Sequence, residues 1–148
     1  MTRDDLLDGA GRALLGLTFV YWGGRQLVDY AGLGAPDGGG WAAYMSAAGV
    51  PGALLPLVIA TQLGGGLLLV IGWRARLAAF LLAGFCLLAD LFFHMHWDAP
   101  PPAGHFNWII FIKNLAVAGG LLVIAGRGPG KVSLDDWRAR RRGPRIAG

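Results

Sequence analysis

Long runs of apolar residues, each ended by charges or turn residues, dominate the chain and predict four membrane-spanning helices. No charged residue occurs between Asp37 and Arg74. Within that window lies an apolar run of about the length that a bilayer core requires, roughly 20 residues. Three further segments have similar lengths and carry only a few ionisable groups. The four predicted spans are residues 13–30, 51–73, 77–97 and 106–126. We therefore expect an all-α membrane protein built as a four-helix transmembrane bundle.

Positive charges flank these segments at one set of connections only. Eleven Arg and Lys residues lie before the first span, in the short connection at 74–76, or after the last span. The connections at 31–50 and 98–105 contain none. The positive-inside rule then places both termini in the cytoplasm. We expect residues 1–127 to form the transmembrane domain and 128–148 to form a basic tail suited to the anionic inner leaflet.

Composition agrees with a membrane protein. Of the 148 residues 55% are hydrophobic and 15% are charged, with a mean hydropathy of +0.51, six Trp and 25 Gly. The single cysteine, Cys86, excludes a disulfide-stapled fold and thiol–disulfide catalysis by this chain alone, and we expect it to be a packing residue. The start, MTRDDLLDG, carries three aspartates where a signal peptide would be positively charged, so we expect the first span to be retained.

Glycine, proline and capping residues mark the connections. The stretch GAPDGGG at 34–40 predicts a turn, and DAPPPAG at 98–104 predicts a proline-stiffened outer hairpin. Gly128-Pro129-Gly130 should end the last span, and Ser133 to Trp137 should cap a short interfacial helix. Small residues, which allow helices to approach closely, form three further groups. These groups are Gly64-Gly65-Gly66, Ala79 with Ala83, and Ala116 with Gly119 and Gly120.

A few polar side chains interrupt the predicted spans, and the deep charges all fall in the outer half of the membrane. Polar groups at such depth usually face other helices, where they pair or serve a function. Asp90 lies seven residues before Trp97, and Lys113 lies seven after Phe106, so both sit about 10 Å below the outer surface. The polar residues are Tyr21, Arg25, Asp29, Thr61, Gln62, Asp90, His94, His96, Asn107, Lys113 and Asn114.

One interpretation of this polar layer is packing alone. Asp90 with Lys113, and Arg25 with Asp29, would form neutralised ion pairs that fix the register of the helices. The amide side chains would then be interhelical hydrogen-bonding groups. These amides are Gln62, Asn107 and Asn114.

The other interpretation is a pocket for the head group of a lipophilic molecule. Lys113, Arg25 and Asn114 would donate hydrogen bonds to a carbonyl or anionic oxygen. His94 would exchange protons near neutral pH, with Asp90 beside it. Aromatic walls would come from four nearby rings, which suits a quinone. These rings are Tyr21, Trp22, Phe92 and Phe93.

The sequence favours neither a metal site nor a nucleic-acid site. The candidate metal ligands are His94, His96 and His105, with Asp98. His94 and His96 are two residues apart and point to different sides of a regular helix, whereas a zinc site needs convergent ligands. No nucleic-acid-binding motif accompanies the arginines of the tail.

Taken together, these segments resemble the DoxX family of small four-helix membrane proteins. The resemblance rests on four stretches: 11–27, GRALLGLTFVYWGGRQL; 62–80, QLGGGLLLVIGWRARLAAF; 94–97, HMHW; and 111–137, FIKNLAVAGGLLVIAGRGPGKVSLDDW. It implies a bacterial inner-membrane protein associated with redox systems. Relatives include the DoxD-type subunit of thiosulfate:quinone oxidoreductase and parts of other membrane oxidoreductase complexes.

The resemblance also implies which polar positions matter. These are Arg25, commonly lysine in the family, Gln62, commonly glutamate, and His94, Lys113 and Asn114. Glutamine at position 62 cannot exchange a proton. A mechanism that needs a carboxylate there would have to use Asp90 instead.

Three functions are consistent with these observations. The leading hypothesis is a membrane subunit of a redox system, acting with a protein partner, whose outer-leaflet pocket binds a quinone or a similar lipophile. The pocket residues would be Arg25, Gln62, Asp90, His94, Lys113 and Asn114. The alternative is a non-enzymatic scaffold or assembly subunit of a larger complex. Passage of a small molecule ranks last, because four helices offer a path only if the chain forms a homo-oligomer.

Overall fold

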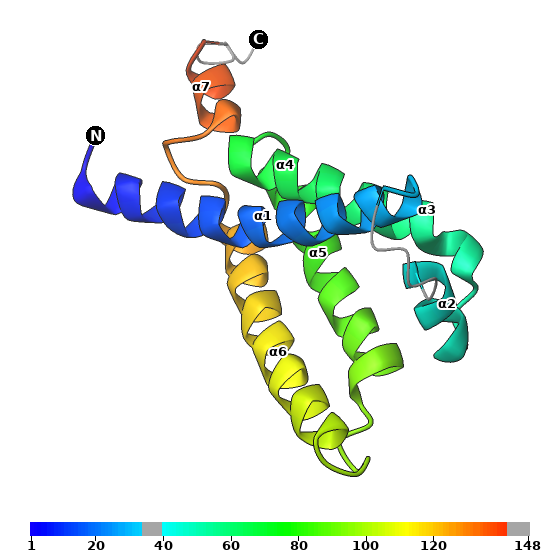
Figure 1. The fold of residues 1–148 in the computed structure, drawn as a ribbon. Helices are drawn as coiled ribbons and strands as arrows, with labels where there is room; N and C mark the ends of the chain where they lie inside the picture. The colour runs from blue at the N-terminus through cyan, green and yellow to red at the C-terminus, as the bar shows by residue number, and fades with distance from the viewer. Residues whose placement is uncertain (34–39, 142–148) are drawn as a thin grey trace, which may run out of the picture.

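The computed structural model describes residues 1–33 and 40–141, and every regular element in these two ranges is helical (Figure 1). The predicted all-α class is therefore confirmed for the described residues. The elements are α1 (Arg3–Tyr30), α2 (Gly40–Ala47), η1 (Gly52–Leu54), α3 (Leu55–Ile59), η2 (Ala60–Gly64), α4 (Gly65–Ile71), α5 (Ala75–Ala89), η3 (Asp90–His94), α6 (Ala103–Arg127) and α7 (Leu134–Arg141). The short elements η2 and η3 are π-helical turns that continue the helices before them.

Three helical stretches are long and apolar enough to cross a membrane. They are Gly52–Ile71, Ala75–His94 and Ala103–Arg127, close to three of the four predicted spans. Helix α1 begins at Arg3 rather than at residue 13, and its first turns are polar. A capping box starts it: the Thr2 hydroxyl accepts from the Asp5 N–H, and the Asp5 carboxylate accepts from the Thr2 N–H at 2.7 Å. That backbone hydrogen bond holds the pKa of Asp5 below its usual value.

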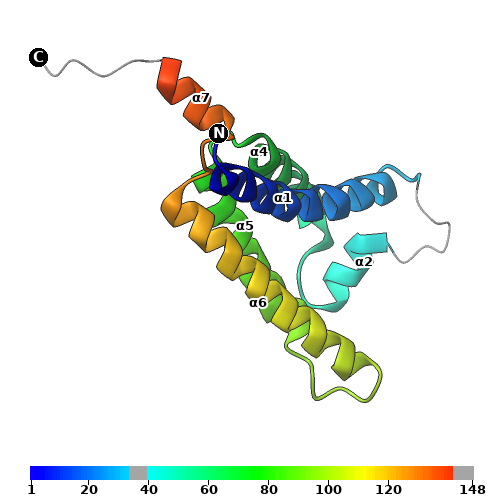
Figure 2. The same cartoon turned by 90° about the vertical axis from the view of Figure 1, so that its left-hand side faces the viewer.

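The long helices pack as two antiparallel hairpins that cross. Helix α1 runs beside the stretch from α3 to α4, and α5 runs beside α6. In Figures 1 and 2 the first hairpin lies across the end of the second, where α4 turns into α5. The buried face of α1, which includes Gly9, Arg12 and Gly16, is thereby covered by α4 and by the chain that follows α6.

Glycines bring α1 and α4 into backbone contact. A Cβ atom at Gly16 would lie 2.8 Å from the carbonyl oxygen of Gly66, and one at Gly23 would lie 2.7 Å from the backbone nitrogen of Leu63. Only glycine fits such distances, because backbone atoms cannot move aside cheaply. The predicted close contact at Gly66 is confirmed. In contrast, Gly64 and Gly119 have open space beside them.

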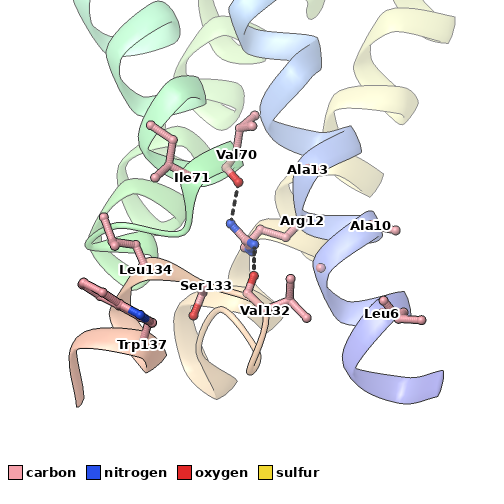
Figure 3. A pocket seen from close by; sticks show the side chains of 11 residues that line it. Leu6, Ala10, Arg12, Ala13, Val70, Ile71, Val132, Ser133, Leu134 and Trp137 are labelled. Atoms are coloured by element: carbon pink, nitrogen blue, oxygen red, sulfur yellow. Dashed lines mark hydrogen bonds between the residues drawn. The ribbon is translucent and has the colours of Figure 1, made fainter. Parts of the chain in front are cut away.

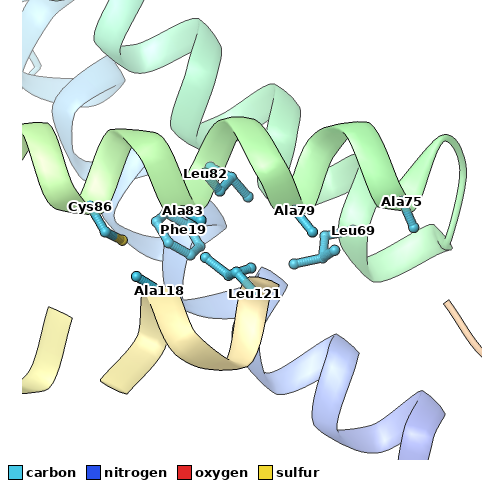
Figure 4. Close-up of a cluster of buried hydrophobic side chains, with 9 residues drawn as sticks. All are labelled: Phe19, Leu69, Ala75, Ala79, Leu82, Ala83, Cys86, Ala118 and Leu121. Atoms are coloured by element: carbon cyan, nitrogen blue, oxygen red, sulfur yellow. The ribbon is translucent and has the colours of Figure 1, made fainter. Parts of the chain in front are cut away.

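The core lies where the two hairpins cross (Figure 4). Phe19 from α1 and Leu69 from α4 meet Leu82 from α5 and Leu121 from α6. Small residues of α5, including Ala79 and Ala83, let the other helices approach, as the sequence indicated. The other members of the core are Ala75, Cys86 and Ala118. Cys86 is thus a buried packing residue, as expected.

The connection between the first two spans differs from the expected plain loop. Residues 40–47 form α2, although no helix was predicted there, and the predicted turn at 34–39 lies outside the described residues. Trp41 and Met45 are one helical turn apart and pack on Leu55 and Ile59. The Trp41 Nε1–H also donates to Asp29 at 2.7 Å. Burial of this apolar face explains why a short segment is helical.

The tail also docks on the helices instead of standing apart from them. The predicted cap is confirmed, because the Ser133 hydroxyl accepts from the Asp136 N–H at 3.2 Å. The Asp135 carboxylate accepts from the N–H groups of Arg74 and Ala75, at 2.9 and 3.0 Å, and so caps the start of α5. The arginines at 142 and 145 lie outside the described residues.

Candidate functional site

A partly buried hydrogen bond joins Asn114 of α6 to Asp90 of η3, the turn that follows α5. The Asn114 Nδ2 donates to Asp90 Oδ1 at 2.7 Å, and Asp90 is only 2% exposed. The sequence therefore placed the partner of Asp90 correctly to within one residue along the helix, but the predicted partner, Lys113, is wrong. Consecutive residues point about 100° apart around a helix. Asn114 consequently faces α5, while Lys113 is exposed and forms no ion pair among the described residues.

Asp90 and His94 lie in the same π-helical turn, η3. Two of their atoms, Asp90 Oδ2 and His94 Nδ1, are buried without a hydrogen-bond partner among the described residues. Buried polar atoms are nearly always paired, so two unpaired atoms in one turn are a notable feature. π-helical turns often occur at functional sites, because they displace side chains from the regular helical positions. The structure thus brings together Asp90, His94 and Asn114 of the predicted site.

A second polar contact joins α1 to the other π-helical turn, η2. The Gln62 Nε2 donates to the Gln26 Oε1 at 2.9 Å, and both side chains are buried. Gln62 was predicted as a site residue, whereas Gln26 was missed in favour of its neighbour Arg25, which is exposed.

A signal for Gln26 exists in the spacing of the buried residues of α1. They follow one another at alternating steps of four and three, which is the heptad pattern of a helix packed along a partner. Most of these residues are small or polar, so a search for apolar positions does not find the pattern. They are Asp5, Gly9, Arg12, Gly16, Phe19, Gly23 and Gln26.

The predicted ion pair between Arg25 and Asp29 is not formed either. Asp29 accepts from Trp41 instead, and no ion pair involving Arg25 occurs among the described residues. The carboxylates of Asp29 and Asp90 therefore bind an indole and an amide. Neither of them binds a cation in the described part of the chain.

Aromatic rings form a continuous row between α1 and His94. Successive ring centroids are 5.3 to 6.4 Å apart, mostly in edge-to-face geometry. The row comprises Tyr21, Trp22, Trp41, Tyr44, Phe93 and His94. Three of the four predicted wall residues belong to it, and α2 supplies the two rings that the sequence did not indicate. Phe92, the fourth, is exposed.

The candidate metal ligands are dispersed. His94 is half-buried, whereas His96 and His105 are exposed. No three His, Cys, Asp or Glu side chains converge within residues 1–33 and 40–141.

The opposite end of the molecule is organised around Arg12, which the sequence indicated only as a flanking charge. Arg12 is 4% exposed, and its guanidinium donates to carbonyl oxygens of α4 and of the tail. The acceptors are Leu69, Val70 at 2.9 Å, Pro129 at 3.1 Å and Val132 at 2.6 Å. Figure 3 shows the guanidinium between α4 and the tail. Arg12 thus satisfies carbonyl groups that the last turn of α4 leaves free.

A groove of about 700 Å³ opens beside Arg12 (Figure 3). Leu6 and Ala10 of α1 line one side, and Ile71, Leu134 and Trp137 line the other. The groove is mainly apolar and lies far from Asp90 and His94, at the other end of α5. Since four of the five guanidinium N–H groups of Arg12 already donate to carbonyl groups, the η3 turn and not this groove is the candidate site.

Comparisons with known proteins agree with the sequence pattern. The DoxX family model matches residues 7–95, and the SURF4 family model matches residues 53–140. The inner membrane protein YqjF of Escherichia coli is 39% identical over 84% of this chain and 85% of its own length. The inner membrane protein YphA of the same organism is 31% identical over 80% and 81%.

More distant similarity reaches eukaryotic proteins. A Surfeit locus protein 4 homolog of Drosophila melanogaster is 33% identical over 49% of this chain and 28% of its own length. No solved structure matches the chain. The DoxX model covers more than half of the residues, and two relatives align over most of the chain. On this evidence, the chain belongs to the DoxX family.

Proposed function

We propose that the chain crosses the bacterial inner membrane four times, with both termini in the cytoplasm. Three stretches are apolar and long enough to span, and α1, which packs along one of them, would be the fourth. Two similar proteins are named inner membrane proteins. Arg76 and Arg127 meet at one end of the helices, where Arg76 donates to the Arg127 carbonyl, and the positive-inside rule assigns that end to the cytoplasm. Residues 1–127 would form the membrane domain, and 128–148 the cytoplasmic tail.

We further propose that the protein is a subunit of a membrane redox system and binds a quinone or a similar lipophile at η3. The observation that carries this proposal is the pair of buried, unpartnered atoms, Asp90 Oδ2 and His94 Nδ1. A quinone has carbonyl oxygens that accept hydrogen bonds and a flat ring that stacks on aromatic side chains. His94 would donate to a carbonyl, and Phe93 and Tyr44, stacked at 5.3 Å, would border the ring. Electrons would come from a partner protein.

The test is the quinone content of the protein purified gently from its native membrane. We expect about one quinone per chain in the unaltered protein. His94→Leu should lose most of this quinone, because leucine has a size similar to that of histidine but no N–H group to donate to the quinone carbonyl. His105→Leu is the matched control, since His105 is exposed on the first turn of α6 and should leave the quinone content unchanged. Equal quinone content in both variants would rule out the η3 site.

The second candidate is a non-enzymatic scaffold. The observation that favours it is that the hydrogen bonds from Gln62 to Gln26 and from Asn114 to Asp90 both join helices of this chain, which suits packing. The match to the SURF4 family model is also consistent with it. A stable protein partner in the same preparation, with no bound lipophile in the unaltered protein, would favour the scaffold.

A further inference from the structure

Three cationic side chains from separate segments surround one depression at the proposed cytoplasmic end. Arg76 lies in the first turn of α5, Arg127 is the last residue of α6, and Lys131 follows in the tail. All three line a depression of about 340 Å³ and are exposed. It shares no lining residue with the apolar groove beside Arg12, and no residue of η3 lines it.

The backbone between these cations has a defined shape. Gly128 and Gly130 both have positive φ values, of 102° and 77°, which favour glycine. A Cβ atom at position 128 would lie 3.2 Å from Nε of Arg76, so glycine also lets this guanidinium approach. The Arg76 Nη2 donates to the Arg127 carbonyl at 3.1 Å and ties α5 to the end of α6. The cations are therefore positioned by the fold.

The carboxylates of the two acidic residues that line the depression already have partners within the protein. Asp135 accepts from two backbone N–H groups of the α4–α5 turn, and Asp136 pairs with Arg140 at 2.6 Å. Lys131 pairs with Asp5 at 3.3 Å. Within the described chain, Arg76 and Arg127 form no ion pair, so their charge is available to an external anion.

Aromatic residues at the same end indicate the depth of the site. The guanidinium of Arg138 lies 5.3 Å from the ring centre of Trp73, and that of Arg141 lies 4.1 Å from the ring centre of Trp137. Tryptophan gathers at the level of lipid head groups. These pairs place the depression at head-group level in the proposed orientation.

We infer that Arg76, Arg127 and Lys131 bind the phosphate group of an anionic phospholipid in the cytoplasmic leaflet. The planar guanidinium groups of two arginines match the oxygens of a phosphate, and Lys131 adds a third donor. The assignment of the leaflet depends on the proposed orientation. The binding itself depends neither on that orientation nor on the quinone.

The test is titration of the full chain, purified in a neutral detergent, with phosphatidylglycerol, phosphatidylcholine or inorganic phosphate, while its melting temperature is measured. We expect stabilisation by phosphatidylglycerol alone. The Arg76→Gln/Arg127→Gln variant should bind it about thirtyfold more weakly at low salt, since each cation at such a surface contributes on the order of fivefold. The control, Arg138→Gln/Arg141→Gln, removes the same charge outside the depression and should retain most of the affinity.

Each other outcome overturns the inference. If the two double variants lose equal affinity for phosphatidylglycerol, the lipid is attracted to the basic surface in general and not to the depression. Equal stabilisation by inorganic phosphate would mean a soluble ligand, and equal stabilisation by phosphatidylcholine would mean that the negative charge is not recognised. If the first double variant does not fold, the single variant Arg127→Gln replaces it. This variant should fold, because the Arg127 side chain forms no hydrogen bond within the described residues. It should bind phosphatidylglycerol about fivefold more weakly, since it lacks one cation. The quinone content of these arginine variants should equal that of the unaltered protein, so failure of the lipid proposal can be distinguished from failure of the η3 proposal.

Discussion

At the scale of single residues, the membrane domain contains a buried pair of neutral amides, Gln26 and Gln62. Their hydrogen bond, 2.9 Å long, joins α1 to η2 where both helices are otherwise lined by glycine and apolar residues. Two amides satisfy each other without the large desolvation cost of an ion pair. The pair therefore fixes the register of α1 at low cost, and each member depends on the other.

This dependence makes a double-mutant cycle informative. Gln62→Leu leaves the Gln26 amide buried without its partner and should lower the free energy of unfolding by about 1 to 3 kcal/mol. Gln26→Leu should have a similar effect. The double variant has no unpaired amide, so it should be destabilised by clearly less than the sum of the two. Thermal unfolding in detergent measures all three. Additive effects would mean that the hydrogen bond contributes nothing specific.

At the scale of elements, the packing of α1 on η2 and α4 depends on alternation between glycines of α1 that face these elements and glycines that do not. Gly23 and Gly24 are neighbours, but only Gly23 has backbone atoms of the partner within reach of a Cβ. Gly23→Ala should destabilise the protein by about 1 to 3 kcal/mol, because Leu63 cannot move aside.

The adjacent position supplies the control. Gly24→Ala meets open space and should be neutral or stabilising by about 0.5 to 1 kcal/mol, because alanine favours the helix. The unfolding temperatures of the two variants, measured in the same detergent, show whether a Cβ atom is tolerated at position 24 but not at position 23. If both variants unfold at the same temperature, α1 does not pack on η2 through Gly23.

The sequence predicted the elements and the relative register of Asp90 and the polar residues of α6 better than it predicted which side chains face one another. Lengths of apolar runs and positions of turn residues are local, and the antiparallel register of α5 and α6 follows from the short connection between them. Whether Lys113 or Asn114 faces Asp90 depends on the rotation of α6 about its axis. The sequence of α6 does not indicate this rotation, because the helix is apolar on most sides and apolar residues can face either lipid or protein.

At the scale of the whole molecule, contacts between distant segments were the least predictable. Arg12 binds carbonyl groups of residues 69–70 and 129–132, and Asp135 caps α5. Backbone carbonyl groups have no signature in a sequence, so Arg12 was indistinguishable from an ordinary flanking cation. The same contacts join the start of α1, the α4–α5 turn and the tail into one unit at the proposed cytoplasmic end.

The proposed fourth span can be tested with introduced cysteines, because the one native thiol, Cys86, is buried and can be replaced by alanine. In that background, Arg3→Cys lies at the start of α1, Tyr44→Cys lies on α2, and Asp98→Cys lies between η3 and α6, all at exposed positions. In intact spheroplasts, a maleimide that cannot cross membranes should label positions 44 and 98, and it should label position 3 only after lysis. Position 3 decides the number of spans, because only α1 separates it from position 44 in the connection at 31–50. If α1 crosses the membrane, positions 3 and 44 lie on opposite sides. Labelling of all three positions in intact spheroplasts would mean that α1 lies on the outer surface. The chain would then cross three times, and the tail and the α4–α5 turn would be its cytoplasmic parts.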